Sequence, residues 1–216
     1  TTGFVIENGE VENFISSGDS GLGVRVLVNG SWGFSSISSP KSFDEIKLNV
    51  TDAVKSALHY SNYKKQKVRL ANVKPSIDII NYKVTMEPTN EEMMRIGLES
   101  DKIIQSKKRI IKSSVSIHHD EFHKYFVNSE GSKIVHNFDD VIANLSATAH
   151  YSGLTESVNT TEGGRGGLEM LAGKNDILVA ANDISEKADA LLDAKTVKEE
   201  KSTVIMNPDF VALLTH

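Results

Sequence analysis

The chain has 216 residues, with 24 lysines and arginines against 29 aspartates and glutamates, 39% hydrophobic residues and no cysteine. These proportions are typical of a folded globular protein and exclude a disordered or collagen-like chain. The lack of cysteine excludes thiolate catalysis and cysteine zinc sites and favours a reducing compartment. A net charge of −5 argues against nucleic acid or an anionic membrane as the main partner.

The sequence contains no segment that predicts membrane insertion or secretion. No stretch approaches 18 consecutive apolar residues, and the first residues lack the basic and apolar regions of a signal peptide. We therefore expect a cytoplasmic protein without a membrane partner. The chain starts without methionine and stops inside an apolar helical pattern at Leu213-Leu214-Thr215-His216, which favours a fragment of a longer protein.

The first 40 residues alternate between apolar and polar positions and predict strands over 4–7, 11–16 and 24–28. Asn29-Gly30 follows, and both residues accept the positive φ of a type I′ turn, so a hairpin with residues 31–36 is expected. Trp32 and Phe34 share one face of that hairpin.

A helix is predicted after this hairpin, because Ser42-Phe43-Asp44-Glu45 is a capping box. Apolar residues at helical spacing predict that this helix packs on the hairpin sheet. They are Ile46, Val50, Ala53, Val54, Ala57 and Leu58.

Residues 63–75 form a basic connector, which we interpret as a solvated linker, with an anion site as the alternative. Its cations are Lys64, Lys65, Lys67, Arg69 and Lys74. A strand over 77–86 follows. The second capping box, Thr89-Asn90-Glu91-Glu92, begins a second helix whose apolar side carries Met93, Ile96, Ile103 and Ile104.

The rest of the chain predicts an antiparallel meander and two more helices. Strands are expected over 110–117, 122–127, 133–138 and 141–150, with a turn at 128–131. A third helix is expected over 177–192, then a charged linker over 195–201, a short strand over 203–206 and a last helix beginning at Asn207-Pro208-Asp209. The fold class is therefore α+β, with antiparallel or mixed sheets and helices packed on one face.

Two segments attract functional interpretation. Glu162-Gly163-Gly164-Arg165-Gly166-Gly167 is predicted to be a glycine-rich loop, and it lacks the Gly-Lys-Ser/Thr of a P-loop. His118-His119-Asp120-Glu121-Phe122-His123 is the densest histidine cluster. On a strand His119, Glu121 and His123 face the same way as three possible metal ligands, but we favour an exposed polar hairpin edge.

Residues 21–36, Gly-Leu-Gly-Val-Arg-Val-Leu-Val-Asn-Gly-Ser-Trp-Gly-Phe-Ser-Ser, resemble the signature hairpin of the TldD/PmbA family of zinc-dependent peptidases, also described as modulators of DNA gyrase. Residues 8–12, 42–60, the segment around Arg165 and residues 204–216 resemble family segments in the same order. The resemblance implies that residues 1–200 form an N-terminal domain that shelters substrate. It implies that residues 201–216 start the C-terminal metallopeptidase domain, which is cut at His216.

In catalytic TldD-type members, a helix ending in Leu-Leu-x-His opens a His-Glu-x-x-x-His zinc motif, and His216 matches the first histidine. The resemblance then implies that the general-base glutamate, the second histidine and a further ligand lie beyond the end, so that no catalytic residue lies within this chain. A catalytic zinc site needs three protein ligands, so the chain alone is expected to be inactive. The intact protein is expected to use a zinc-activated water against a peptide carbonyl.

The resemblance also implies the partners. The substrates are expected to be short or unfolded peptides, with exposed strand edges able to receive an extended peptide. Gly163, Gly164, Arg165, Gly166 and Gly167 are the candidate substrate-binding residues. A homodimer, or a heterodimer with a PmbA/TldE-like paralogue, is expected. The alternative is a non-catalytic PmbA/TldE-type subunit that binds peptide and dimerises, and His216 favours the catalytic type over it.

Overall fold

The computed structural model describes residues 1–173, 176–195, 198–199, 201 and 203–216. Its strands are β1 (Thr2–Glu7), β2 (Glu10–Ser16), β3 (Gly21–Val28), β4 (Ser31–Ser38), β5 (Ile77–Asn81), β6 (Ile110–Val127), β7 (Lys133–Tyr151) and β8 (Leu154–Arg165). Its helices are α1 (Phe43–Ser61), α2 (Asn90–Ile104), the 3-10 helix η1 (Leu168–Leu171), α3 (Ile177–Leu191) and α4 (Pro208–Thr215).

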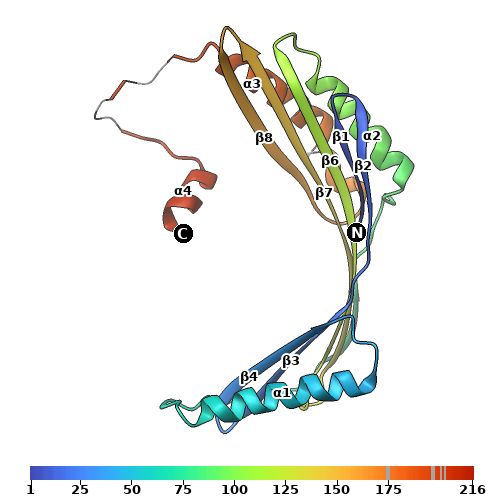
Figure 1. Ribbon diagram of the computed structural model, residues 1–216, viewed down its shortest axis with the longest axis vertical. Coiled ribbons are helices and arrows are strands. Elements are labelled where there is room, and N and C mark those ends of the chain that lie inside the picture. The colour runs from blue at the N-terminus through green and yellow to red at the C-terminus, as the bar shows by residue number, and fades with distance from the viewer. Residues whose placement is uncertain (174–175, 196–197, 200, 202) are drawn as a thin grey trace.

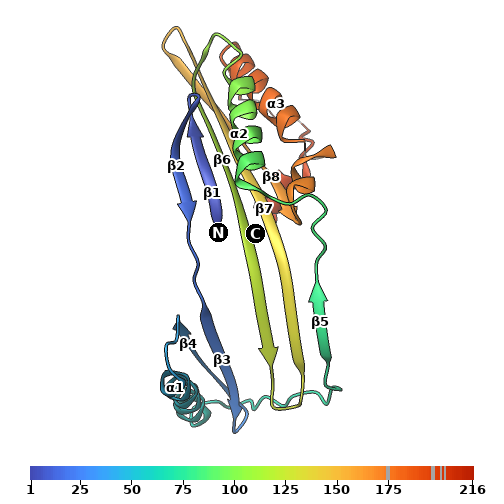
Figure 2. The same ribbon diagram turned by 90° about the vertical axis from the view of Figure 1, so that its right-hand side faces the viewer.

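Two sheets organise the described chain. The main sheet has the order β2-β1-β6-β7-β5, and β8 also pairs with β7. All its pairs are antiparallel except β5 with β7. The second sheet is the β3–β4 hairpin, which α1 covers (Figure 1). Figure 2 shows α2 and α3 on one face of the main sheet, so the predicted α+β class with mixed sheets is confirmed.

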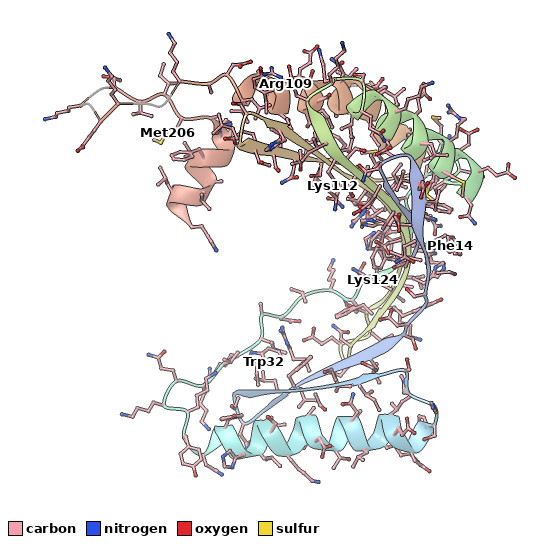
Figure 3. All side chains as sticks on the ribbon, turned by 45° about the horizontal axis from the view of Figure 1, so that its top comes forward. Phe14, Trp32, Arg109, Lys112, Lys124 and Met206 are labelled. Carbon is pink, nitrogen blue, oxygen red and sulfur yellow. The ribbon has the colours of Figure 1, made fainter. Side chains whose placement is uncertain are left out.

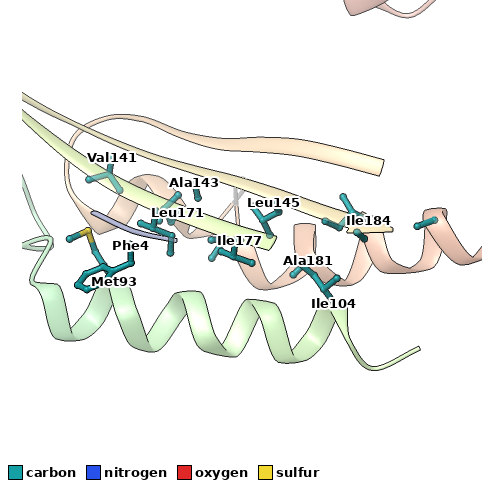
Figure 4. Close-up of a cluster of buried hydrophobic side chains, with 14 of the residues drawn as sticks. Phe4, Met93, Ile104, Val141, Ala143, Leu145, Leu171, Ile177, Ala181 and Ile184 are labelled. Atoms are coloured by element: carbon teal, nitrogen blue, oxygen red, sulfur yellow. The ribbon is translucent and has the colours of Figure 1, made fainter. Parts of the chain in front are cut away.

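The core lies between the main sheet and the helices α2 and α3 (Figure 4). Alternate residues of β7 point into it, because successive side chains of a strand face opposite sides. These β7 residues are Val141, Ala143, Leu145, Ala147 and Ala149. The helices contribute Met93, Ile104, Ile177, Ala181, Ile184 and Ala188. We call the opposite face of the main sheet the inner face, and no helix of the described residues packs on it (Figure 1).

The predicted hairpin and its helix are confirmed, and Ala53 and Ala57 of the predicted apolar stripe are buried, but the rest of the contact face differs from the one expected. Asn29 and Gly30 have φ of 49° and 74°, as the type I′ turn requires. The residues of α1 that are buried are small or polar and recur every fourth position: Asn49, Ala53, Ala57 and Ser61. Val50 and Leu58 are exposed, so that part of the predicted apolar stripe was wrong. Gly33 on β4 lets the helix backbone approach closely, and only small side chains fit there.

The predicted helix starts are correct. The Ser42 hydroxyl accepts a hydrogen bond from the Glu45 N–H at 3.2 Å, and the Thr89 hydroxyl accepts one from the Glu92 N–H at 3.3 Å. These bonds satisfy backbone donors that the first turn of a helix leaves free. Both predicted N-caps are therefore confirmed. The glutamates of the two capping boxes bind other donors: the Glu45 carboxylate accepts a hydrogen bond from the Lys41 N–H at 2.9 Å, and the Glu92 carboxylate accepts one from the Arg95 side chain at 2.9 Å.

Several strand predictions need correction. The four strands of the predicted meander are two long strands, β6 and β7, because the polar residues between them stay in the ladder, where Asp120 pairs with Asp140. The strand β8 was not predicted from the sequence, because the residues on both of its faces are mostly polar. Residues 163–165 of the expected glycine-rich loop are the end of β8. The strand expected over 77–86 ends at Asn81, and 203–206 forms no strand.

The last helix also begins where expected. The Asn207 side chain accepts a hydrogen bond from the Phe210 N–H at 2.9 Å, and Pro208 occupies the first turn. Figure 1 shows α4 apart from the main sheet, on its inner side. Part of the charged linker predicted over 195–201 lies outside the described residues. Among the helices of the described chain, none is long and apolar enough to cross a membrane.

Candidate functional site

The inner face of the main sheet gathers aromatic and cationic side chains that are distant in sequence. The rings of Phe122 and Phe138 stack with centroids 4.8 Å apart, and those of Tyr82 and His136 lie 5.3 Å apart. The Lys124 ammonium lies 4.8 Å from the Phe138 ring. Figure 3 shows Lys124 on the inner side of the curved sheet. Cations over aromatic faces are held by the ring quadrupole, so this cluster is preorganised.

Arg165, a candidate substrate-binding residue, is part of this cluster. Its guanidinium carbon lies 3.8 Å from the Phe138 ring centroid and 5.3 Å from that of Tyr82. Its Nε donates to the Asp140 carboxylate at 3.1 Å, and this hydrogen bond raises the pKa of Arg165. The arginine is therefore fixed on the inner face while its side chain stays 40% exposed, so it can still meet a ligand.

The glycines beside Arg165 are required by close backbone contacts. A Cβ at Gly163 would lie 2.1 Å from the Val141 carbonyl oxygen, and one at Gly167 would lie 2.1 Å from the Met86 carbonyl oxygen. Gly163 also has φ of +122°, which side-chain residues rarely adopt. These glycines let the end of β8, which carries Arg165, and the bend after it lie close to neighbouring backbone. Their candidate role in substrate binding stays a prediction.

Glu169, which the sequence did not single out, holds this turn together. Its carboxylate accepts hydrogen bonds from the backbone N–H groups of Thr85, Met86 and Gly167 at 3.2, 2.9 and 3.0 Å. Partial burial opposes the charged form, but these donors outweigh it and lower the pKa of Glu169 from 4.5 to about 2. The charged carboxylate therefore ties the segment before α2 to the end of β8.

We expect Glu169→Gln to lower the free energy of unfolding at neutral pH but not in acid. The unfolded chain takes up the proton near pH 4.5 and the folded chain only near pH 2. The stability due to the carboxylate is therefore present above pH 4.5 and lost as the pH falls to 2. With solvent screening, the difference in unfolding free energy should be about 1–2 kcal/mol at pH 7. Denaturant titrations at several pH values measure it, with Glu130→Gln in the exposed turn as control. An equal loss at pH 7 and pH 2 would contradict this assignment.

His216, the candidate metal ligand, follows the last residue of α4 and is exposed. Its backbone N–H donates to the Ala212 carbonyl at 3.2 Å, which continues the helical hydrogen bonds to this residue. Within the part of the chain that the structure describes, no three His, Cys, Asp or Glu side chains are placed to hold a metal together.

The histidine cluster on β6 does not form a metal site either. His119, Glu121 and His123 do share a face, as expected for a strand, but it is the face opposite the inner one. His119 Nε2 lies 2.6 Å from the Asp139 carboxylate. His123 contacts Asn137 at 3.0 Å and Glu121 at 3.1 Å, and these neighbours raise its pKa. His119 and His123 of β6 are thus each paired with a polar side chain of β7, Asp139 and Asn137 respectively.

Sequence reasoning found Arg165 but missed the residues that hold it. Phe138 and Asp140 lie on β7, and Tyr82 directly follows β5. Strand pairing brings these two distant segments to Arg165 at the end of β8. The one available signal was the alternation of His136, Phe138 and Asp140 on a strand, which predicts a shared face without naming its partner.

The curved mixed sheet with two helices on its outer face and the β3–β4 hairpin covered by α1 form an α+β fold. Two family models match this chain. "PmbA/TldA metallopeptidase domain 1" matches residues 1–60, and "PmbA/TldA metallopeptidase central domain" matches residues 87–192. The chain belongs to the PmbA/TldD family.

Curated relatives and solved structures agree with this assignment. A metalloprotease from Methanocaldococcus jannaschii is 30% identical over 98% of this chain, and one from Methanothermobacter thermautotrophicus is 26% identical over 100%. The chain spans 46% of each of these relatives. A candidate modulator of a DNA gyrase from Thermotoga maritima has a TM-score of 0.65 at 14% identity, covering 91% of this chain and 43% of that one. TldE from Thermococcus kodakarensis has a TM-score of 0.54 at 12% identity, covering 87% and 40%. These two likenesses concern the fold.

Proposed function

We propose that this chain is the N-terminal part of a TldD-like zinc-dependent peptidase that hydrolyses short or unfolded peptides. The observation that carries the proposal is the 30% identity to a metalloprotease over 98% of the chain, with both family domains matched in order. In this proposal residues 1–200 shelter the substrate, and α4 leads into the metal-binding part.

The chain's own residues do not fit a complete zinc site. His216 is one imidazole on an exposed helix end, and no three His, Cys, Asp or Glu side chains of the described residues are placed to hold a metal together. A catalytic zinc needs three protein ligands and a water. We therefore assign this chain no step of the hydrolysis. Its proposed contribution is to bind and orient the peptide and to supply one ligand.

The main sheet offers the surface that such a peptide needs. β5 is exposed along its length and pairs on one side only, with β7. An extended peptide can add to a free strand edge through backbone hydrogen bonds, which suits substrates of varied sequence. Arg165 and the glycine-rich turn stand at the end of β8, on the same inner face as Lys124.

The proposal predicts the metal content of the protein made from its complete gene. We expect about one zinc per chain, because three ligands and a water complete a catalytic site. His216→Ala should abolish zinc binding, whereas His123→Ala, which alters an equally exposed histidine of β6, should leave it intact. Mass spectrometry under native conditions and elemental analysis measure both. A full-length protein without metal would instead support the non-catalytic PmbA/TldE-type subunit, and zinc retained in His216→Ala would exclude His216 as a ligand.

A further inference from the structure

An aromatic pocket lies at the far end of the hairpin–helix unit, away from the main sheet. Its volume is about 360 Å³, and it is lined by Ser31 and Trp32 of β4, Tyr60 of α1, and Tyr63 and Lys64 just beyond it. Tyr60 and Tyr63 are 59% and 74% exposed, which is unusual for large aromatic side chains. Figure 3 shows Trp32 on the hairpin face turned away from α1.

The pocket walls are held in place by the end of α1. The N–H groups of Tyr63 and Lys64 both donate to the Tyr60 carbonyl at 3.1 Å, which fixes the turn after the helix. The His59 ring lies 5.5 Å from the Tyr60 ring and 5.4 Å from the Tyr63 ring. Because the two tyrosine side chains are already positioned without a ligand, a ligand that binds in the pocket need not order them at a large entropy cost.

A strip of positive charge borders this pocket. The basic connector, residues 63–75, holds five cations and no acidic residue in a chain whose net charge is −5. It is anchored at the hairpin tip, where the Val68 N–H donates to the Gly30 carbonyl at 2.8 Å and the Lys67 ammonium donates to the Ser61 carbonyl at 3.2 Å. The connector is exposed over most of its length, as expected for a solvated linker, and these two hydrogen bonds hold it at residues 67–68.

The remaining cations are available to a partner. Among the residues that the structure describes, no ion pair involves Lys64, Lys65 or Arg69. On β3, the Arg25 guanidinium lies 5.5 Å from the centroid of the Trp32 ring. The aromatic pocket is thus framed by positive charge from two elements.

We propose that this pocket and the basic connector bind an acidic peptide segment that carries an aromatic side chain. The aromatic ring enters the pocket between Trp32 and the tyrosines, and the flanking carboxylates pair with Lys64, Lys65 and Arg69. A pocket near 360 Å³ is at the small end of ligand sites, about 300–1,000 Å³, and suits one side chain. Aromatic side chains are the common anchors of such contacts.

Single-stranded nucleic acid also uses cations and aromatic rings, but the observations favour a peptide. Nucleic acid binding needs a positively charged groove along several nucleotides and successive stacking rings. Here one pocket is present and the chain as a whole is negative, which repels a polyanion at long range. A peptide with a few carboxylates avoids most of that repulsion.

Binding is tested with the full-length protein and a short fluorescent peptide holding one tryptophan among aspartates and glutamates. The role of the bound peptide as substrate rests on the proposed function, but the assay contains a chelator and measures binding without cleavage. We expect saturable binding that weakens with salt. Tyr63→Ala, at a position 74% exposed and therefore safe for folding, should weaken binding about tenfold. Lys65→Glu with Arg69→Glu should weaken it further and flatten the salt dependence.

Tyr125→Ala is the matched control, because Tyr125 is 76% exposed on β6, outside the pocket, and its loss should leave binding unchanged. Three results would overturn the proposal. They are equal binding of a peptide with alanine in place of tryptophan, tighter binding of oligothymidine than of the peptide, and self-association that Tyr63→Ala abolishes in a protein that binds no peptide. Peptide binding without any peptidase activity would uphold this inference and contradict the proposed function alone.

Discussion

Gly33→Val is expected to separate α1 from the β3–β4 hairpin. Trp32 should then lose its contact with the Tyr60 side of the pocket and become more exposed to solvent. A Cβ at position 33 would lie 2.0 Å from the Ala53 carbonyl oxygen, 2.5 Å from the Ala57 nitrogen and 2.8 Å from the Ala57 Cβ. Two of these are backbone atoms of α1, so no side-chain rotation relieves the overlap. Overpacking of this kind should cost about 3 kcal/mol in unfolding free energy.

This effect is measured through the single tryptophan of the chain, which stands next to the substituted residue. The fluorescence of Trp32 should shift towards that of exposed indole, and amide exchange should quicken in α1, β3 and β4. Gly18→Ala is the control, because a Cβ at Gly18 meets no atom within 4 Å. A Gly33→Val protein that unfolds at the denaturant concentration of the wild type would show that α1 does not pack on β4 as described.

Leu145→Ala should produce a loss of similar size in the main sheet. Leu145 is 1% exposed and lies in the core that β7 forms with α2 and α3 (Figure 4). Truncation removes buried methyl groups and leaves a cavity, so the unfolding free energy should fall by about 2–5 kcal/mol. Chemical denaturation followed by circular dichroism measures it. Leu154→Ala, at a position 56% exposed, should change it little. A loss no larger than that of Leu154→Ala would contradict the described core.

The sequence predicted best where the signal is local. The turn at Asn29-Gly30 and the N-caps at Ser42 and Thr89 depend on residues within one or two turns of the backbone, and each is confirmed. Hydrophobic spacing misplaced the contact face of α1, because a glycine on the partner strand decides how near the helix can come. That information lies on β4, outside the helix.

The candidate site was less accessible to sequence reasoning. Arg165 was noticed through its glycines, but Phe138 and Asp140, which hold it, come from another strand and are brought there by the register of β7 with β8. The strand β8 itself was missed because its side chains are polar on both faces, so period-two alternation gives no signal. Pairing between strands that are distant in sequence decides both the neighbours of Arg165 and the presence of β8, and such pairing leaves no local sequence pattern.

We propose that the complete protein is a zinc-dependent peptidase to which this chain contributes substrate binding and His216. The most direct measurement is cleavage of an unfolded peptide by the full-length protein, followed by mass spectrometry of the products. We predict cleavage that stops when a chelator removes the metal, returns when zinc is added, and is absent in His216→Ala but present in His123→Ala. Cleavage that persists in chelator or in His216→Ala, or no cleavage by the zinc-loaded protein, would contradict the claim.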